Sequence, residues 1–291
     1  MKEFLDYLQS LVADGGPEPH QYDDLNDWFH RASSSVSSLT KAELTQLWDS
    51  FGRVFSMETL QGFSARKPYG YAGDFDIIER IYIRHASPDP ELYRWDQFFH
   101  WQVACKAVCN RKTYFKDAMQ HLQSVNPDAR VLDVACGSCR DIYEFLQANP
   151  QSRLSFDCID LDEKAIAFAR KLVTAQQVNL WQGNAFHYTF RAKHYDIVWS
   201  AGLFDYLEDR HFRVLLKRLA RAVKPGGELI IGNFTEPNQS RAYMEFGGWI
   251  LIHRTASQLI ELAAQAGMAH NEITIRQEPI GLNLFMHVRL P

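Results

Sequence analysis

Residues 131–140 constrain the fold of this chain more than any other segment. An apolar run of the kind found in parallel strands ends at Asp133, a turn of small residues follows through Gly137, and residues 140–146 have the apolar spacing of an amphipathic helix. Small residues in such a turn allow the backbone to approach a ligand closely. The segment therefore predicts the strand, turn and helix of a nucleotide-binding α/β fold.

The turn lacks the fingerprint of a dinucleotide-binding fold. That fingerprint, G-x-G-x-x-G, needs three glycines around a pyrophosphate, and only Gly137 is present here. The pattern acid-x-small-x-Gly instead resembles motif I of class I S-adenosylmethionine (SAM) methyltransferases, in which the turn faces an amino acid and a ribose. Ala135 and Cys139 stand where many of those enzymes carry glycine.

Polar residues follow the next two expected strands. Residues 154–160 end at Asp160, which lies 23 positions after Gly137 (160 minus 137), close to the spacing of about 20 expected for a carboxylate that binds a ribose diol. Residues 181–185 resemble the Gly-Asp-Ala element whose acid contacts the adenine amine in methyltransferases, with Asn184 in place of the acid. An amide oxygen still accepts a hydrogen bond from an amine, so the substitution preserves this chemistry.

The remaining elements predict a sheet covered on both sides by helices. Further strands are expected at residues 195–200 and 228–234 and near residues 273–276 and 284–290. A helix and a turn separate the first two of these strands. The helix carries Phe212, Leu215, Leu216, Leu219 and Val223 on one face, and the turn is Lys-Pro-Gly-Gly at 224–227. Alternating strands and helices give a mostly parallel sheet with an antiparallel edge, the Rossmann-like fold of class I methyltransferases. In this sheet Asp162 is expected to cap a helix and Asp196 to order the start of a strand.

The chain before this sheet carries helical signals only. Thr40 and Glu43 have the spacing of a capping box before an apolar helix, and the stretch 91–121 is helical and rich in aromatic residues. We therefore expect an N-terminal helical cap at 1–123 and a SAM-binding domain at 124–291.

The segment 67–75 is expected to be a structured loop between helices of the cap. It combines a proline with two glycines and two tyrosines, Tyr69 and Tyr71. The tyrosine rings would offer cation-π stabilisation to a sulfonium. The alternative is a loop whose tyrosines only fill an interface between the two parts of the chain.

Composition excludes several classes of function. The net charge is -4 with basic and acidic residues interspersed, so we expect no nucleic-acid partner. No apolar segment reaches the length of a membrane span and the first residues do not start a signal peptide, which together predict a cytoplasmic protein. Five cysteines, an odd number, argue against a disulfide framework, and Cys136-x-x-Cys139 lies in the cofactor turn, so no metal site is assigned.

Motifs spread from about residue 60 onward resemble one bacterial branch of the class I methyltransferases, the extracellular-factor 3-hydroxypalmitate methyl ester synthases. They are Lys-Pro-x-Gly-Tyr-Ala-Gly-Asp-Phe at 67–75, Ala-Val-x-Asn-Arg-Lys at 107–112, Gly-Leu-Phe-Asp-Tyr-Leu at 202–207, Gly-Asn-Phe at 232–234, Met-Glu at 244–245 and Trp-Ile-Leu-Ile-His-Arg at 249–254. The resemblance implies transfer of the SAM methyl group to the carboxylate of a small or fatty 3-hydroxy acid. A carboxylate is ionised at neutral pH, so such a reaction needs no general base. Arg111 or Arg254 would orient the acid, or each forms a structural ion pair.

Two other functions remain open at this stage. The chain also resembles bacterial azetidine-2-carboxylate synthases, which keep the methyltransferase fold but cyclise SAM itself and release methylthioadenosine. Such a reaction needs a narrow pocket that bends the methionyl arm and excludes water, and Tyr69, Tyr71, Tyr206 and Asn233 are the candidates to build it. The third reading is a SAM-binding module without catalysis.

The candidate SAM contacts follow from the motifs. We expect them at Asp133, Ala135, Gly137, Asp160, Leu161, Asn184, Ala185, Ser200 and Phe204. The same four residues named for the pocket, the three tyrosines and the asparagine, are the catalytic candidates.

Overall fold

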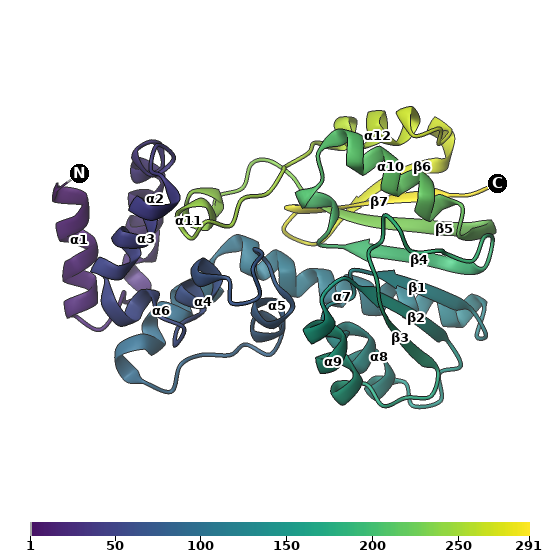
Figure 1. Cartoon of the computed structure of the whole chain (residues 1–291), viewed down its shortest axis with the longest axis horizontal. Coiled ribbons are helices and arrows are strands. Elements are labelled where there is room, and N and C mark those ends of the chain that lie inside the picture. Colours follow the sequence, from purple (N-terminus) through teal and green to yellow (C-terminus); the bar gives the residue numbers. More distant parts are fainter. Residues whose placement is uncertain (1) are drawn as a thin grey trace. The chain divides into compact units, whose positions relative to one another are not determined.

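The computed structural model describes residues 2–291, with side chains from residue 6 onward, and divides into two compact units (Figure 1). The first comprises Met1–Lys106 and Asn238–Ile250, and the second comprises Ala107–Pro237 and Leu251–Pro291. Within the described residues, no helix combines the length and the apolar character that a membrane span requires.

The first unit is helical, as the sequence predicts. Its elements are α1 (Lys2–Ala13), η1 (Pro19–Gln21), α2 (Tyr22–Val36), α3 (Lys41–Ser50), η2 (Gly52–Phe55), α4 (Leu60–Arg66), α5 (Phe75–Tyr82), α6 (Pro90–Trp101), the first residues of α7 (Val103–Val125) and α11 (Arg241–Phe246). The capping box at the start of α3 is present: the Thr40 hydroxyl accepts the Glu43 N–H at 3.3 Å, and the Glu43 carboxylate accepts the Thr40 N–H at 2.8 Å. The apolar run after Thr40 is split, because Gly52 takes a φ of +57° and the chain continues as η2.

A return segment, residues 238–250, completes the core of this helical unit. Its helix α11 places Phe246 against Trp28, Phe29 and Phe55, with ring centroids 5.1–6.0 Å apart. The hydroxyl of Tyr243 in the same helix donates to the side chain of Gln61 at 2.8 Å. Residues from the C-terminal half of the chain are therefore part of the N-terminal helical core.

The second unit contains one seven-stranded sheet with the order β3-β2-β1-β4-β5-β7-β6. The strands are β1 (Arg130–Val134), β2 (Ser155–Asp160), β3 (Val178–Gln182), β4 (Tyr195–Ala201), β5 (Val223–Phe234), β6 (Ile273–Gln277) and β7 (Asn283–Arg289). Strands β1 to β5 pair in parallel, whereas β7 pairs with both β5 and β6 in the antiparallel sense. This confirms the expected α/β fold with an antiparallel edge.

Successive residues of the strands point to two different cores. On one face, Trp199 of β4 and Phe285 of β7 pack with α7, α8 (Arg140–Ala148) and α9 (Glu163–Leu172). On the other face, Val198 of β4 and Ile231 of β5 pack with α10 (Asp209–Ala220) and α12 (Ala256–Gln265). Figure 1 shows α10 and α12 on one side of the sheet and α8 and α9 on the other. Burial on both faces explains the nearly continuous apolar runs of these strands.

Two local expectations need correction. Val223, expected on the apolar face of α10, is the first residue of β5, because α10 ends at Ala220. The Lys-Pro-Gly-Gly segment at 224–227 does not precede β5 but bulges from it. The pairing with β4 passes from Val223 opposite Tyr195 to Glu228 opposite Ile197, so the four residues 224–227 of β5 stand opposite the single residue Asp196 of β4.

The compact units divide the chain differently from the expected boundary after residue 123. Their boundary lies at Lys106, inside α7, and the return segment belongs to the first unit. Helical periodicity continues without a break through α7, so the sequence offers no signal at that point.

Candidate functional site

The carboxyl ends of the parallel strands place the predicted residues of the second unit at one edge of its sheet. The strand order reverses between β1 and β4, and ligands of open α/β sheets bind at such a reversal, outside the carboxyl ends. Asp133 lies near the end of β1, Asp160 ends β2, and Ser200 precedes the last residue of β4. Sequence and topology therefore point to the same edge.

The turn after β1 has an unusual backbone. Ala135, Gly137 and Cys139 have φ values of +61°, +55° and +54°, the left-handed region that favours glycine. For the two residues with side chains, this conformation costs about 1–2 kcal/mol each. The alternation of left-handed residues explains why glycine is frequent at these positions in the family that the turn resembles.

Asp160 holds this turn in place. One oxygen of its carboxylate accepts the N–H of Gly137 at 2.9 Å, and the other accepts the N–H of Asp162 at 2.9 Å. Burial raises the pKa of Asp160, and these hydrogen bonds oppose that rise. Each carboxylate oxygen retains a lone pair, which is the acceptor that a ribose diol requires.

Asp162 and Asp196 have the local roles expected of them, and Leu161 is exposed. Leu161 follows with 65% of its surface exposed, so its side chain is open to a ring stacked on it. Asp162 caps α9, accepting the N–H of Lys164 at 2.8 Å, as expected. Asp196 orders strand starts at the opposite edge of the sheet, where it accepts the Arg130 N–H at 2.8 Å.

Asn184 and Ala185 lie after β3 in a short turn. The side-chain oxygen of Asn184 accepts the N–H of Phe186 at 2.9 Å, so this oxygen already stabilises the turn. The amide NH₂ group is then the part of Asn184 suited to an adenine nitrogen. Ala185 is partly buried against the core.

Ser200, Phe204 and Asn233 serve the packing of the unit. The Ser200 hydroxyl is fully buried and donates to the carbonyl of Val134 at 2.9 Å, which ties β4 to β1. Phe204 has no exposed surface and packs edge to face on Phe212. Ser200 and Phe204 were expected to line the methionyl arm of SAM. Neither residue has exposed surface in this structure.

Asn233 is likewise committed to protein partners. Its amide NH₂ donates to the carbonyls of Phe234 and Ile252, and its oxygen accepts from Arg254 at 3.0 Å. Arg254 is 3% exposed and also pairs with Asp209 at 2.8 Å, so it has the structural role that the sequence left open. In this geometry Asn233 positions the chain after β5 and has no unused amide hydrogen for a substrate.

Arg111 lies at the site edge, whereas Arg254 belongs to the packing. Arg111 of α7 is 8% exposed. A Cβ built on Gly202 would lie 2.6 Å from the Nη1 atom of Arg111. Gly202, with a φ of +102°, therefore leaves room for the guanidinium over the end of β4. Burial raises the pKa of three carboxyl groups, those of Asp133, Asp141 and Asp205, and the charge of Arg111 opposes that rise.

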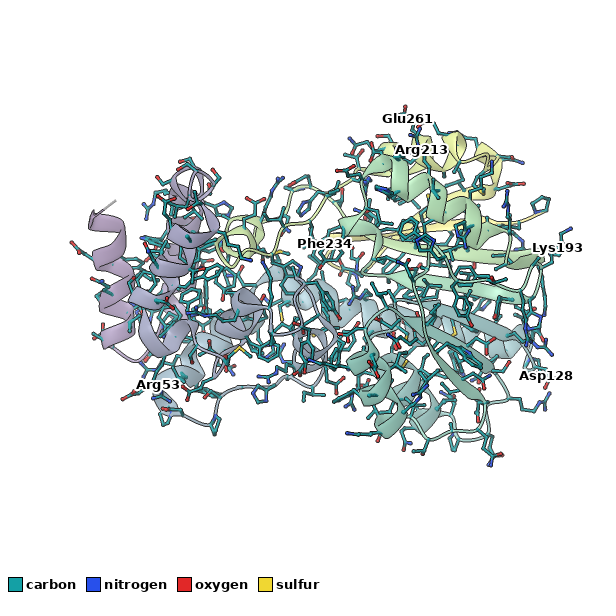
Figure 2. The ribbon with its side chains drawn as sticks, in the orientation of Figure 1. Arg53, Asp128, Lys193, Arg213, Phe234 and Glu261 are labelled. Atoms are coloured by element: carbon teal, nitrogen blue, oxygen red, sulfur yellow. The ribbon has the colours of Figure 1, made fainter. Side chains whose placement is uncertain are left out.

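These three carboxyl groups all interact electrostatically with Arg111, and the sequence predicted only Asp133 among them. Burial is the largest cause of their raised pKa values, which reach about 6 for Asp141 and Asp205. Asp205 follows β4 and accepts the N–H of Phe234, labelled at the end of β5 in Figure 2, at 2.5 Å. The missed signal was positional: Asp141 opens the helix after the turn, and Asp205 follows the end of β4.

The predicted tyrosines belong to different units. Tyr69 and Tyr71 lie in the α4–α5 loop of the first unit, where the Tyr69 ring packs on Phe75 at 4.6 Å and Tyr71 is 40% exposed. The Lys67 ammonium anchors this loop by donating to the carbonyl of Gly248 at 2.6 Å. Tyr206 ends η3 (Phe204–Tyr206) of the second unit and is 37% exposed.

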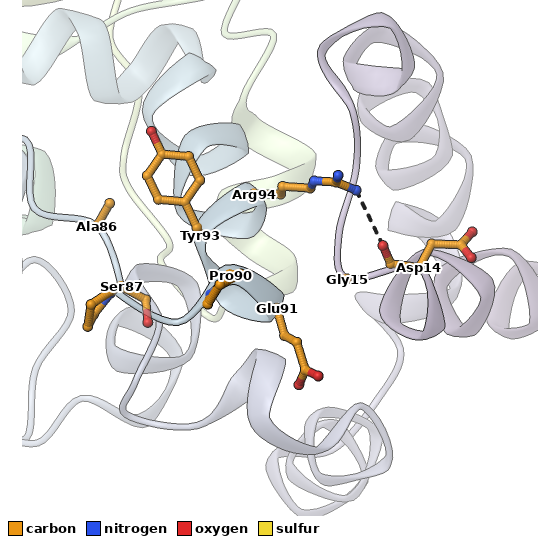
Figure 3. A pocket seen from close by; sticks show the side chains of 9 residues that line it. Asp14, Gly15, Ala86, Ser87, Pro90, Glu91, Tyr93 and Arg94 are labelled. Carbon is orange, nitrogen blue, oxygen red and sulfur yellow. Dashed lines mark hydrogen bonds between the residues drawn. The ribbon is translucent and has the colours of Figure 1, made fainter.

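A cleft of about 760 Å³ lies in the first unit, beside the start of α6 (Figure 3). Its lining includes Asp14, Ser87, Tyr93 and Arg94, and the Arg94 guanidinium donates to the Asp14 carbonyl at 3.3 Å. None of the predicted site residues lines it.

The family model and the curated proteins that match this chain are described as methyltransferases. A family model described as a methyltransferase domain matches residues 131–227. The chain is 30% identical over 131 residues to a demethylmenaquinone methyltransferase of Bacillus cytotoxicus, an alignment that covers 43% of this chain and 53% of that protein. It is 26% identical over 128 residues to a ubiquinone/menaquinone biosynthesis C-methyltransferase of Wigglesworthia glossinidia brevipalpis, covering 42% and 50%. The chain spans about half the length of these curated relatives.

Solved structures share the fold. A possible exported protein from Bordetella parapertussis superposes with a TM-score of 0.63 and 21% identity, over 75% of this chain and 79% of that one. Magnesium protoporphyrin IX methyltransferase from Synechocystis, with bound S-adenosylhomocysteine, superposes with a TM-score of 0.50 and 13% identity, over 65% and 88%. The second unit thus has the fold of SAM-dependent methyltransferases, and SAM is its cofactor.

Proposed function

We propose that this chain transfers the SAM methyl group to the carboxylate of a small or fatty 3-hydroxy acid in the cytoplasm. The observation that carries this assignment is Arg111, a buried guanidinium over Gly202 at the carboxyl end of β4. A guanidinium offers paired N–H donors that match the two oxygens of a carboxylate. The acid would be held there with one oxygen directed at the methyl group.

The residues present fit SAM. Its sulfonium and ammonium groups are cationic, and a cation beside Asp133, Asp141 or Asp205 would favour the ionised form of these carboxyl groups, whose pKa values burial raises. Asp160 offers its remaining lone pairs to the ribose diol, and Leu161 offers an exposed apolar surface to the adenine. SAM supplies a methyl group activated by its positive sulfur.

The protein residues then act by binding and orientation. A carboxylate nucleophile is already ionised at neutral pH, so no side chain has to remove a proton. Rate enhancement comes from holding the carboxylate oxygen in line with the methyl group, a contribution of up to about 7–11 kcal/mol in favourable cases. We assign Tyr206, which lies in the sheet unit, to enclosing the methyl group and keep Asn233 as the residue that positions the chain after β5. A Tyr206→Phe variant with reduced turnover and unchanged SAM affinity would support this role, and a change in melting temperature alone would contradict it.

Cyclisation of SAM is the alternative chemistry on this fold. The family match and the curated relatives give it no specific support. Incubating the purified protein with SAM alone and identifying the products by mass spectrometry separates the two reactions. Methylthioadenosine with a new imino acid, above the spontaneous background, would establish the cyclase and refute methyl transfer as the main activity.

If SAM remains intact, release of S-adenosylhomocysteine is measured with 3-hydroxy acids of increasing chain length. Release that depends on the acid, together with a methyl ester product, supports the proposed function. The Arg111→Met variant should then lose acid-dependent turnover while retaining SAM affinity. Binding of SAM without turnover on any acid would favour a non-catalytic module.

The ribose contact has a direct test in binding. Asp160→Ala removes charge-assisted hydrogen bonds and should weaken SAM binding by about 1.5–3 kcal/mol, or roughly 10- to 150-fold in Kd. Titration calorimetry on the wild type and the variant measures this loss. Asp157→Ala, on the same strand but away from its carboxyl end, is the matched control and should keep the wild-type affinity. An unchanged Kd for Asp160→Ala would refute the ribose assignment.

A further inference from the structure

Three of the five cysteines meet beneath the turn that follows β1. Cys136 and Cys139 belong to the turn and Cys158 to β2, and all three side chains pack in the same apolar core of the sheet unit. Cys139 and Cys158 have no exposed surface, whereas Cys136 is partly exposed. None of the three forms a disulfide in this structure, and methyl transfer uses none of them.

The backbone brings Cys136 and Cys139 within reach of a covalent bridge. The N–H of Cys139 donates to the carbonyl of Cys136 at 3.0 Å, which closes a four-residue β-turn. The first and last Cα atoms of such a turn lie within ~7 Å of each other. Disulfides join residues whose Cα atoms are about 4.4–6.8 Å apart, so only a small adjustment of the turn is needed.

We propose that Cys136 and Cys139 are a reversible oxidation site that lowers the affinity of the protein for SAM. The oxidant is a peroxide. The sulfur of Cys136, the least buried of the three residues, attacks one peroxide oxygen and becomes a sulfenic acid, releasing water from the other oxygen. The Cys139 sulfur then attacks the Cys136 sulfur and displaces a second water, so two thiols lose two protons and two electrons and hydrogen peroxide becomes two waters. A thiol reductant reverses the step.

The bridge would act on the cofactor turn because the turn lies inside it. Gly137, enclosed between the two cysteines, donates its N–H to Asp160 at 2.9 Å, and Cys139 holds a φ of +54°. A disulfide draws the two Cβ atoms to about 3.8 Å and changes both backbone positions. The Asp160 carboxylate then loses its fixed orientation toward the ribose. This effect on affinity rests on the proposed contact of the turn with SAM.

The environment of the thiols sets the speed of the reaction. Interaction with the Cys139 thiol and burial raise the pKa of Cys136, and burial raises the pKa of Cys158. Only the thiolate attacks a peroxide, so oxidation should be slow at pH 7 and faster as the pH rises. A slow, reversible reaction suits sustained oxidative conditions.

The experiment compares reduced and oxidised full-length protein. Hydrogen peroxide treatment at pH 8.5 is followed by peptide mapping under non-reducing conditions and by titration calorimetry with SAM. We expect a peptide that links Cys136 to Cys139, a Kd for SAM at least 10-fold higher than that of the reduced protein, and recovery of the Kd after dithiothreitol. Cys139→Ser should show no dependence of its Kd on peroxide, whereas Cys158→Ser and the control Cys109→Ser should retain it.

Several outcomes would overturn the oxidation site. They are a bridge between any other pair, sulfinic or sulfonic acid at Cys136 without a bridge, and a verified Cys136–Cys139 bridge with an unchanged Kd. A reduced protein that binds no SAM would contradict the proposed function instead, and the mapped disulfide would still stand as a separate observation.

Discussion

Two residues of the turn after β1 hold a backbone conformation that side chains disfavour. Ala135 and Cys139 both have positive φ, yet the turn keeps its shape because Gly137 and Asp160 are joined by a hydrogen bond and Cys139 is fully buried. Backbone strain of this kind persists where the surrounding structure over-determines it, and it is concentrated at ligand sites.

Glycine at the first of these positions should relieve strain. We expect Ala135→Gly to raise the free energy of unfolding by about 0.5–1 kcal/mol, because the left-handed penalty for alanine exceeds the entropy that glycine adds to the unfolded chain. Chemical denaturation measures the change. Ala118→Gly, inside α7, is the matched control and should lower the stability by about 1 kcal/mol. A loss of stability in both variants would contradict the strain.

A buried carboxyl group should make stability depend on pH. The folded-state pKa of Asp205 is raised to about 6 by burial, above the value of about 3.9 for an unfolded chain. The folded state therefore holds an extra proton between these two values, and the stability that it confers is complete below about pH 4 and lost as the pH rises through 6. Asp205→Asn keeps an oxygen for the Phe234 N–H and removes this titration.

The decline in unfolding free energy from pH 4 to pH 7 should thus be smaller in Asp205→Asn than in the wild type, by up to about 3 kcal/mol. Denaturation at a series of pH values measures the difference. Asp117→Asn, exposed on α7, should keep the wild-type slope. Equal slopes in all three proteins would refute the raised pKa.

Motifs in the sequence predict which residues stand at strand ends, but they do not predict which side chains are buried. Asp133, Gly137 and Asp160 stand at the positions that spacing alone predicted, because strand ends are readable from apolar runs. Ser200 and Asn233 also fit motifs, but their side chains satisfy backbone groups of neighbouring segments that are distant in sequence. Spacing along one strand carries no information about such partners.

At the level of elements, α7 is fixed to three neighbours by three consecutive residues. Asn110 donates to the Glu278 carboxylate in the β6–β7 loop at 2.7 Å, Arg111 lies over Gly202, and Lys112 pairs with Glu144 of α8 at 2.5 Å. The Ala-Val-x-Asn-Arg-Lys motif thus fixes the orientation of α7. The same contacts fix the position of the Arg111 guanidinium, which we propose to bind the acid.

The loop between β6 and β7 depends on one buried carboxylate. Glu278 is 1% exposed and accepts three backbone N–H groups at 2.8–3.1 Å in addition to Asn110. Glu278→Ala should lower the free energy of unfolding by about 3 kcal/mol, since two buried and two part-buried donors lose their partner. Asn110→Ala should cost less, and the double variant should lose less than the sum of the two, because both remove the same hydrogen bond.

Chemical denaturation of this double-mutant cycle gives the coupling, which we expect at about 1–3 kcal/mol. Thr113→Ala, exposed on α7, replaces Asn110→Ala in the control cycle and should be additive with Glu278→Ala. Additivity of the Asn110 cycle would show that the contact contributes nothing to the loop.

Most elements were predictable because their periodicity is strong and their ends are marked. The seven strands and the capping box of α3 are confirmed, whereas the bulge at 224–227 was not expected. The same glycines and proline are compatible with a turn before β5 and with a bulge inside it. The pairing of β5 with β4 distinguishes the two, and this pairing cannot be read from the local sequence.

At the scale of the whole molecule, the first unit contains residues from two distant parts of the chain. The chain passes from the second unit into the return segment after Pro237 and comes back to the second unit at Leu251. Asn233 and Arg254, which hydrogen-bond to each other, lie a few residues outside these two points. No repeat or composition change marks this excursion, so the sequence predicted a simple boundary. Aromatic packing between α11 and α2 is the property that defines the unit.

Removing one ring of the return segment should destabilise the N-terminal helices. Phe246 is 2% exposed and contacts three aromatic side chains, so Phe246→Ala should lower the stability of the first unit by about 3–5 kcal/mol. Limited proteolysis should then cut within residues 2–106 first, with the sheet unit persisting. Ile250→Ala, at a side chain that is 66% exposed, should leave the pattern unchanged. New cuts confined to the sheet unit would contradict this organisation.

The return segment also sets an order of events during synthesis. The N-terminal helices leave the ribosome first, but the residues that finish their core follow Lys106 only after another 131 positions, the interval from 107 to 237. At a translation rate of about 5–20 residues per second, the helices wait roughly 7–26 s with an unfilled aromatic core. The interval would expose the nascent chain to chaperones and proteases, and it makes completion of the helical unit a checkpoint that only a chain translated past α11 can pass.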